Sequence, residues 1–242
     1  VYTGQYSTHR RKKFGVRPVD NNYDQFVVFA QNHDHIGNRL MGDRLASSLS
    51  FDSLKLVAAT VLLSPHVPLL FMGEEYGEKN PFQYFISHTD SKLVELVRQG
   101  RKKEFEYFGW KEEIPDPQSE DTFKICKLSW AFEHDDEAAT LLKLYSRLIA
   151  FRKSRPAMKG TARTSLQLID HTPESVIAFD RTHDGDTVRI VLNFSKTIQT
   201  LQLHRHYDVL IDTDAACWQG YTKSNIKDNT LYIAPQSAIV LE

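Results

Sequence analysis

Residues 26–39 read Phe-Val-Val-Phe-Ala-Gln-Asn-His-Asp-His-Ile-Gly-Asn-Arg, an apolar run that changes abruptly into polar and ionisable side chains. The unbroken run 26–30 predicts a short strand buried on both faces of a parallel sheet. In α/β folds the carboxyl ends of such strands carry the active site. The stretch therefore predicts a strand followed at once by a candidate catalytic loop, in which His33 and Asp34 are the first ionisable side chains.

A helix and a second buried strand are predicted after this loop. Within 54–62 the apolar residues recur at i, i+3, i+4, i+7 and i+8, which predicts an amphipathic helix that ends at Ser64-Pro65. The next apolar run, 67–72, predicts a strand, with Pro68 near its start where a proline is tolerated. Strand, helix and strand in this order predict a right-handed βαβ unit with two adjacent parallel strands.

The rest of the chain divides into a helical part and a β part. Helices are predicted over 91–107 and along the apolar face of 141–149. From about residue 160 the pattern changes to short alternating runs separated by turn signals, which predicts an antiparallel β-sandwich. We place a domain boundary between residues 158 and 159. The predicted strands cover 176–179, 188–194, 198–203, 207–211, 231–233 and 238–241.

The composition narrows the class of protein. With 30 Lys and Arg against 31 Asp and Glu, the formal net charge of −1 leaves no basic excess for nucleic-acid binding. The apolar stretch 54–72 contains two prolines and a lysine, so no membrane span is expected. Two cysteines suit a reducing compartment, and the opening residues lack a signal-peptide pattern. We therefore expect a cytoplasmic globular protein.

Two segments carry a resemblance to a known family. Residues 26–34, a strand ending in Asn32-His33-Asp34, resemble the strand-seven motif of the alpha-amylase superfamily, glycoside hydrolase family 13. Residues 68–77 resemble its strand-eight motif. The resemblance implies that 1–158 are the C-terminal portion of a (β/α)8 TIM barrel, with strands seven and eight, and that the antiparallel β-sandwich of 159–242 follows it. A complete barrel of this kind needs roughly 200 residues or more, so most of it is expected outside these residues.

Within the superfamily, the finer resemblance is to the malto-oligosyltrehalose trehalohydrolases. It implies a hydrolase of α-1,4-glucans that releases trehalose from maltooligosyltrehalose. Glucan branching enzymes share much of the same framework, so glycosyl transfer remains the alternative reaction. A non-catalytic carbohydrate-binding or scaffold fragment is a third hypothesis. The segments that carry this resemblance are 2–15, 31–45, 68–77, 84–90 and 116–123.

The family resemblance implies a retaining mechanism. Such enzymes use a nucleophile and an acid/base about 5–5.5 Å apart. In the family, the Asp nucleophile follows strand four and the Glu acid/base follows strand five, so both are expected upstream of this chain. The third family carboxylate matches Asp34, which would hold the 2- and 3-hydroxyls of the reacting sugar and stabilise the transition state. His33 matches a histidine that grips the same sugar. Asn32 is placed with it among the substrate-binding residues, although Asn32 and Asn38 also suit a bracing role in the loop.

Aromatic and acidic residues near these motifs have two interpretations each. Tyr84, Phe85, Trp110 and Trp130 could stack on sugar rings or pack in the core, and we place the first two among the substrate-binding residues. Glu74 and Glu75 stand at the end of the second strand. Because the family's strand-eight carboxylate pins the barrel rim, we assign Glu74 and Glu75 a structural role near the site.

Metal and phosphate chemistry find little support in the sequence. His33-Asp34-His35 could be read as metal ligands, but successive residues point in different directions and no second cluster has ligand spacing. We therefore expect no metal and no cofactor. The basic run 10–13 suits a solvated loop in a chain of balanced charge.

Without a nucleophile and an acid/base, the 242 residues alone are expected not to hydrolyse glycosidic bonds. A partial barrel also leaves a strand edge and an apolar surface uncovered. We expect the chain to self-associate through that surface, to rearrange, or to require the N-terminal part of the barrel as a partner. The expected ligand is a maltooligosaccharide.

Overall fold

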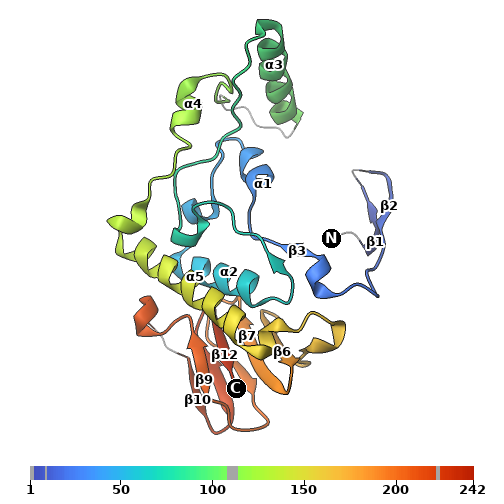
Figure 1. Cartoon of the computed structure of the whole chain (residues 1–242), viewed down its shortest axis with the longest axis vertical. Helices are drawn as coiled ribbons and strands as arrows, with labels where there is room; N and C mark the ends of the chain where they lie inside the picture. The colour runs from blue at the N-terminus through green and yellow to red at the C-terminus, as the bar shows by residue number, and fades with distance from the viewer. Residues whose placement is uncertain (1–2, 9, 108–113, 222–223) are drawn as a thin grey trace.

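The structure, a computed structural model, describes residues 3–8, 10–107, 114–221 and 224–242. Helices α2 (Phe51–Leu63) and α5 (Asp136–Ser154) lie against the β-sheets of the C-terminal half (Figure 1). On the other side of these helices the chain extends through α1 (His33–Gly37) to α3 (Ser91–Tyr107). The candidate loop is therefore on the side of the helical layer that faces away from the sheets.

The two predicted parallel strands pair as expected. β3 (Val27–Val28) and β4 (Val67–Pro68) form a parallel pair, and the Val67 N–H donates to the Phe26 carbonyl at 2.9 Å. The regular ladder is shorter than the apolar runs that predicted it. The prediction that the first strand is buried on both faces is wrong, because Val27 is 57% exposed. Within the described residues this sheet has two strands, so no third strand covers its edges.

Helix α2 forms where the apolar spacing predicts it. Its first turn is capped by Ser50, whose Oγ accepts a hydrogen bond from the Ser53 N–H at 3.2 Å, and it ends before Ser64-Pro65. The buried surface differs from the predicted amphipathic face, because Leu56 and Ala59 are buried while two of the predicted positions, Leu54 and Val57, are only half-buried. The buried surface covers more than one face of the helix because α5 and the five-stranded sheet both pack against α2. The helices predicted over 91–107 and around 141–149 are confirmed as α3 and α5.

The C-terminal half consists of two antiparallel sheets, and all six predicted strands are confirmed. The five-stranded sheet has the order β5-β6-β7-β12-β9, and the three-stranded sheet has the order β10-β11-β8. Two further strands, β5 and β10, each of three residues, were not predicted. The strands are β5 (Leu166–Leu168), β6 (Val176–His183), β7 (Asp186–Asn193), β8 (Gln199–Gln202), β9 (Val209–Asp212), β10 (Asn225–Lys227), β11 (Thr230–Ile233) and β12 (Ser237–Leu241).

The five-stranded sheet is buried on both faces. Along β7, Val188, Ile190 and Leu192 join a core with α2 and α5, while Val191 joins the core between the two sheets. This division follows from the alternation of side chains along a strand. The β6–β7 hairpin closes with Asp184 and Gly185, both at positive φ (49° and 75°), which is the backbone of a two-residue type I′ turn.

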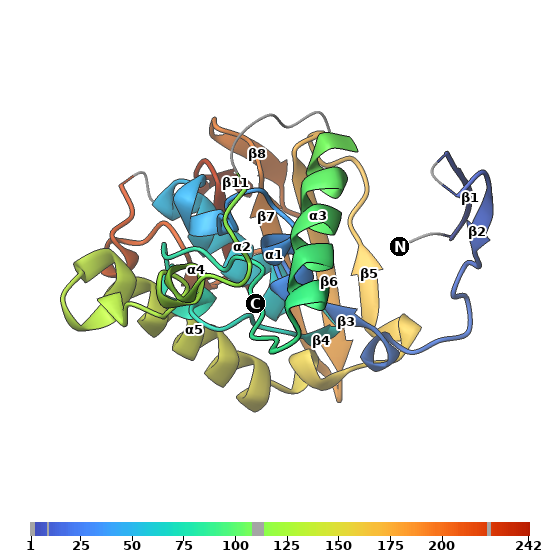
Figure 2. The same ribbon diagram turned by 90° about the horizontal axis from the view of Figure 1, so that it is seen from above.

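The remaining elements are short. An antiparallel hairpin of β1 (Thr3–Ser7) and β2 (Lys12–Gly15), which was not predicted, stands clear of the other elements in both views (Figures 1 and 2). It contains the basic run. The helix α4 (Glu120–Lys124) follows α3. The 3₁₀ turns are Tyr23–Gln25, Leu45–Ser47, Glu74–Tyr76, Ala131–Glu133, Pro156–Lys159, Arg163–Ser165 and Ala216–Trp218. A search of the described residues found no helix with the length and apolar character needed to cross a membrane.

Two arginines, the buried Arg181 and the half-buried Arg152, hold the end of α2. Arg152 of α5 donates from Nη1 to the Leu62 carbonyl at 2.8 Å, and Arg181 of β6 donates from Nη1 to the Ser64 carbonyl at 3.1 Å. The second guanidinium also donates to the carbonyls of Met158 and Gly160, each at 2.9 Å. Burial, and then the neighbouring Arg152 charge, lower the pKa of Arg181 to about 10. The carbonyls that end the helix are thus satisfied by side chains from two other elements.

Arg181→Met should destabilise the chain by about 2–4 kcal/mol, because it leaves buried carbonyl oxygens without donors. Chemical denaturation monitored by circular dichroism measures the change. The exposed substitution Arg17→Met is the matched control and should lie within about 0.5 kcal/mol of wild type. Equal stabilities for the two variants would contradict this account of α2.

Candidate functional site

The candidate loop folds into a short helix at the end of β3. Asn32 is extended, and its side-chain Oδ1 accepts a hydrogen bond from the His35 N–H at 2.8 Å, so it caps the first turn of α1. The sequence folds this way because Asn is a favoured N-cap residue. The first backbone N–H groups of a helix have no partner within the helix, and the Asn32 side chain satisfies one of them. This cap is the bracing role that the sequence suggested for Asn32, and it uses the carbonyl oxygen of the Asn32 side chain.

His33 and Asp34 occupy the first turn of α1 and point to solvent. Their side chains are 69% and 71% exposed, and His33 Nε2 lies 3.4 Å from Asp34 Oδ1. A carboxylate in this position can accept hydrogen bonds from two adjacent sugar hydroxyls, and the imidazole can donate to the same sugar. The structure brings together the two residues that the family motif pairs, on the carboxyl side of a parallel strand.

The C-terminal end of α1 is held by α3. Arg101 donates from Nη2 to the Gly37 carbonyl and from Nη1 to Asn38 Oδ1, both at 2.9 Å. The Asn38 N–H in turn donates to the Asp34 carbonyl at 3.2 Å. The bracing role suggested for Asn38 thus runs through a residue 63 positions further along the chain.

Tyr84 and Phe85 lie in different environments. Phe85 packs edge-on against Phe82 and Phe123, with ring centroids 5.8 and 5.2 Å apart. This packing favours a core role for Phe85 over a contact with sugar. Tyr84 is 42% exposed, and the Arg101 guanidinium lies 4.7 Å from its ring centroid. Its placement keeps a stacking role open, because an exposed ring face is what a sugar needs.

The other two aromatic candidates divide in the same way. Trp110 lies outside the described residues. Trp130 is 53% exposed and stacks on Tyr76, with centroids 6.3 Å apart. Among the described residues, the ring contacts of Trp130 are with Tyr76 and Phe132 rather than with the His33–Asp34 turn.

Glu74 is buried in the 3₁₀ turn that follows β4. Its Oε2 accepts a hydrogen bond from the Phe71 N–H at 3.0 Å, and the Tyr145 hydroxyl approaches Oε1 at 3.5 Å. Burial raises the pKa of the Glu74 carboxyl to about 7, against the lowering effect of hydrogen bonds from Phe71 and Gln31. The carboxyl thus joins the end of β4 to α5, which supports a structural role. Glu75, the next residue, is half-buried.

Sequence reasoning missed two buried charges that fix the loop after β4. Arg44 donates from Nε to the Asn80 carbonyl and from Nη1 to the Met72 carbonyl, both at 2.7 Å. Glu78 accepts from the Tyr76 hydroxyl at 2.8 Å and from the Ser129 N–H at 2.6 Å. Burial alone would raise the pKa of Glu78, but these hydrogen bonds and others hold it below its usual value. Neither residue belongs to a local pattern, so the resembling segment 31–45 was the single signal that included Arg44.

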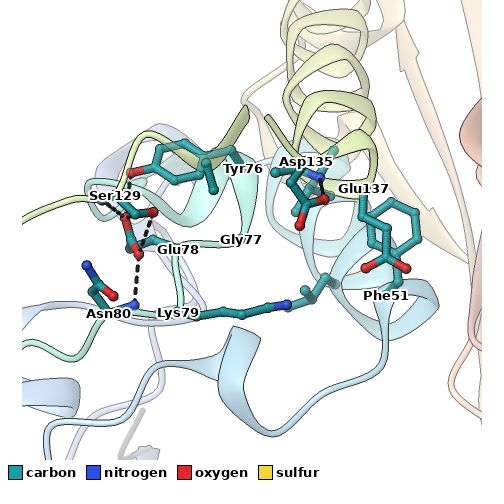
Figure 3. Close-up of a pocket in the computed structure, with 13 residues that line it drawn as sticks. Phe51, Tyr76, Gly77, Glu78, Lys79, Asn80, Ser129, Asp135 and Glu137 are labelled. Atoms are coloured by element: carbon teal, nitrogen blue, oxygen red, sulfur yellow. Dashed lines mark hydrogen bonds between the residues drawn. The ribbon is translucent and has the colours of Figure 1, made fainter. Parts of the chain in front are cut away.

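A cavity of about 260 Å³ opens next to this loop, between the starts of α2 and α5 (Figure 3). Figure 3 shows the Glu78 carboxylate turned toward Ser129 and Tyr76 rather than into open space. None of the predicted site residues lines this cavity. The His33–Asp34 turn is therefore exposed and separate from this cavity.

The described residues contain no group of three or more His, Cys, Asp and Glu side chains arranged to hold a metal ion. His35, which the sequence places beside His33, turns instead to Phe29, with ring centroids 5.3 Å apart. His35 thus points away from the neighbouring pair, as the sequence argument assumed, whereas His33 and Asp34 approach each other at 3.4 Å.

The sequence of this chain is similar to a known family and to named proteins. Residues 168–242 match the family model "Alpha amylase, C-terminal all-beta domain". The chain is 44% identical over 175 residues to malto-oligosyltrehalose trehalohydrolase from Brevibacterium helvolum, a match that covers 70% of this chain and 30% of that protein. It is also 44% identical over 153 residues to the Saccharolobus solfataricus protein of the same name, covering 63% and 25%. The matched part of this chain spans less than a third of the length of these relatives.

Solved structures extend the similarity to the whole chain. A putative alpha amylase from Salmonella typhimurium has a TM-score of 0.80 at 34% identity, covering 99% of this chain and 39% of that one. A pullulanase from Anoxybacillus sp. LM18-11, solved with maltotetraose, has a TM-score of 0.56 at 16% identity, covering 91% and 28%. The second likeness concerns the fold alone.

The raised pKa of Glu74 predicts a pH-dependent stability. Between its ordinary value of 4.5 and about 7, the folded chain keeps a proton that the unfolded chain has lost. Stability from this group is therefore complete below pH 4.5, falls as the pH rises to about 7, and is level above it. Glu74→Gln cannot ionise, so it should gain about 3 kcal/mol relative to wild type between pH 4 and pH 8.

Denaturant unfolding of both proteins at several pH values measures this difference. Glu75→Gln, at the adjacent and less buried position, is the control and should follow the wild-type profile. Parallel profiles for Glu74→Gln and wild type would show that Glu74 does not hold a proton in the folded chain.

Proposed function

We propose that this chain, which belongs to the alpha-amylase superfamily, is the C-terminal portion of a retaining glycosidase that releases trehalose from maltooligosyltrehalose. One observation carries the proposal. The Asn32-His33-Asp34 turn lies at the carboxyl end of a strand that pairs in parallel with the next strand of the chain, in a sequence similar to trehalohydrolases. Active sites of parallel α/β folds lie at this end of their strands.

In this proposal β3 and β4 are strands seven and eight of a (β/α)8 barrel. Residues 1–158 are the C-terminal portion of that barrel, and residues 159–242 are the β-sandwich domain that follows it. The open edges of the two-stranded sheet support the assignment. Val27, Val67 and Leu69 are 57%, 42% and 39% exposed, although apolar strand residues are normally covered. Further strands of a barrel would pair with these edges and bury these side chains.

Asp34 has the role of transition-state stabiliser. As the glycosidic bond breaks, the sugar ring flattens and gains positive charge, and its hydroxyls become better donors. Hydrogen bonds from these hydroxyls to a carboxylate then strengthen, which lowers the barrier more than it tightens substrate binding. His33 holds the same sugar in place, and Tyr84 offers it an aromatic face.

The bond-breaking groups come from outside this chain. In a retaining reaction, one carboxylate attacks the anomeric carbon while a carboxylic acid protonates the leaving oxygen, and water then releases the bound sugar. The 71% exposure of Asp34 agrees with this division, because such chemistry requires a site from which bulk water is excluded. The rest of the barrel would supply both the reacting pair and the cover.

Hydrolysis is favoured over glycosyl transfer by the names of the relatives. Proteins from Brevibacterium, Saccharolobus and Arthrobacter at 41–44% identity are all named trehalohydrolases. The proposed enzyme uses no cofactor and no metal. It acts in the cytoplasm, an assignment supported by two free cysteines, Cys126 and Cys217.

The role of Asp34 is tested in a chimaera in which this chain replaces the matched segment of the Brevibacterium helvolum relative. Asp34→Asn should lower kcat for maltooligosyltrehalose by roughly 10²–10³, by analogy with the loss of one transition-state hydrogen-bonding group. KM should change less, since the lost interaction forms mainly in the transition state. His33→Ala should mainly raise KM. The matched control is Asp24→Asn, an exposed carboxylate before β3, which should keep the parent's kcat. A chimaera with normal kcat after Asp34→Asn would rule out the proposed role.

The chain alone should show no turnover. Purified residues 1–242 are incubated with maltooligosyltrehalose and with soluble starch, and released trehalose and reducing ends are measured. Hydrolysis by the chain alone that disappears in Asp34→Asn would overturn the division of the site between two parts of a barrel. Sugar binding by the chain without turnover in the chimaera would instead favour the non-catalytic hypothesis.

A further inference from the structure

Arg101 is a buried cation that makes contacts with two elements of the candidate site. It lies on α3, and its side chain is 12% exposed. One edge of the guanidinium donates to the Gly37 carbonyl and to Asn38 Oδ1, each at 2.9 Å, and an ion pair with Glu104 at 3.0 Å completes the polar contacts. The hydrogen bonds from Nη1 and Nη2 therefore join the end of α1 to its own helix, α3.

The same guanidinium also lies over two aromatic rings. Its central carbon lies 4.7 Å from the ring centroid of Tyr84 and 4.7 Å from that of Phe105. Phe105 is buried and belongs to α3, whereas Tyr84 belongs to the loop after β4 and is exposed. A cation held in this way fixes the plane of the Tyr84 ring.

The helix that carries Asp34 depends on such outside contacts. α1 has five residues, and helices this short are unstable by themselves. Asn32 holds its first turn, and the last turn is linked through the Asn38 N–H to the Asp34 carbonyl. Arg101 secures that last turn, so the backbone of Asp34 is held between Asn32 and the Asn38–Arg101 contact.

We infer that Arg101 is a positioning residue, which fixes the His33–Asp34 turn through Gly37 and Asn38 and also contacts the Tyr84 ring. The inference rests on the proposed function, because it takes Asp34 as the transition-state stabiliser. A lysine could replace the charge but not the fork that reaches two acceptors between two rings. Helix α3 would thus act on the reaction without touching the sugar.

The first test uses the 242-residue chain. Arg101→Leu should raise backbone hydrogen exchange in the peptide covering residues 33–40, because the amides of Asn38 and Arg39 lose their support. Arg101→Lys, which keeps the charge and most of the packing, should give a smaller increase. Lys102→Leu removes an exposed cation from the same helix and is the matched control. Exchange in 33–40 that is the same in all four proteins would overturn the inference.

The second test measures kinetics in the chimaera. Arg101→Leu should lower kcat by about 10-fold or more, since a displacement of about 1 Å in a catalytic group can cost about 10²-fold. In the Asp34→Asn background, the same substitution should lower kcat by less than 3-fold, because its effect acts through Asp34. A merely structural role would reduce kcat by the same factor in both backgrounds.

These outcomes separate the two proposals. Normal kcat in Asp34→Asn contradicts the proposed function, whatever Arg101 does. A large loss in Asp34→Asn together with an equal effect of Arg101→Leu in both backgrounds leaves the proposed function standing and overturns the positioning role. If Arg101→Leu does not fold, Arg101→Lys gives the same comparison, with a smaller loss of kcat expected in the parent background and none in Asp34→Asn.

Discussion

The carbonyl groups at the C-terminal end of α2 are buried, and a buried carbonyl requires a donor. Arg152 and Arg181 supply these donors, one from α5 and one from the five-stranded sheet. This requirement joins three elements that are far apart in sequence. It fixes the point from which the chain re-enters the parallel pair as β4, because β4 begins four residues after α2 ends. The register of β3 with β4, and hence the position of the His33–Asp34 turn, depends on where α2 ends.

Local patterns predicted the elements that bury a regular face. The run 26–30, the helical spacing of 54–62 and the six alternating runs after residue 160 each report a repeating contact, and each was found. They did not reveal how much of α2 is covered, or that Val27 is exposed, because burial is set by neighbouring elements rather than by the residue itself. The β1–β2 hairpin was missed because its polar residues show no alternation of apolar and polar positions.

The residues of the candidate site could be predicted where they are adjacent and form a motif. They could not be predicted where contacts join residues far apart in the sequence. Asn32, His33 and Asp34 are adjacent, so their grouping needed no structure. Arg101 and Glu78 act on residues up to 64 positions away, and no spacing rule connects such positions. From the sequence, Tyr84 and Phe85 were both predicted to bind the substrate. The structure distinguishes them, because one ring is exposed and the other packs between phenylalanines.

The place of β12 in the sheet has a consequence for how the protein is made. β12 lies between β7 and β9, yet it is the last strand of the sheet along the chain. The face that covers α2 cannot close until residues 237–241 have left the ribosome. At about 5–20 residues per second, α2 waits roughly ten to forty seconds for this strand, covered until then by α5 and the earlier strands alone. Through that interval a nascent chain would present to chaperones the part of the α2 surface that packs against β12.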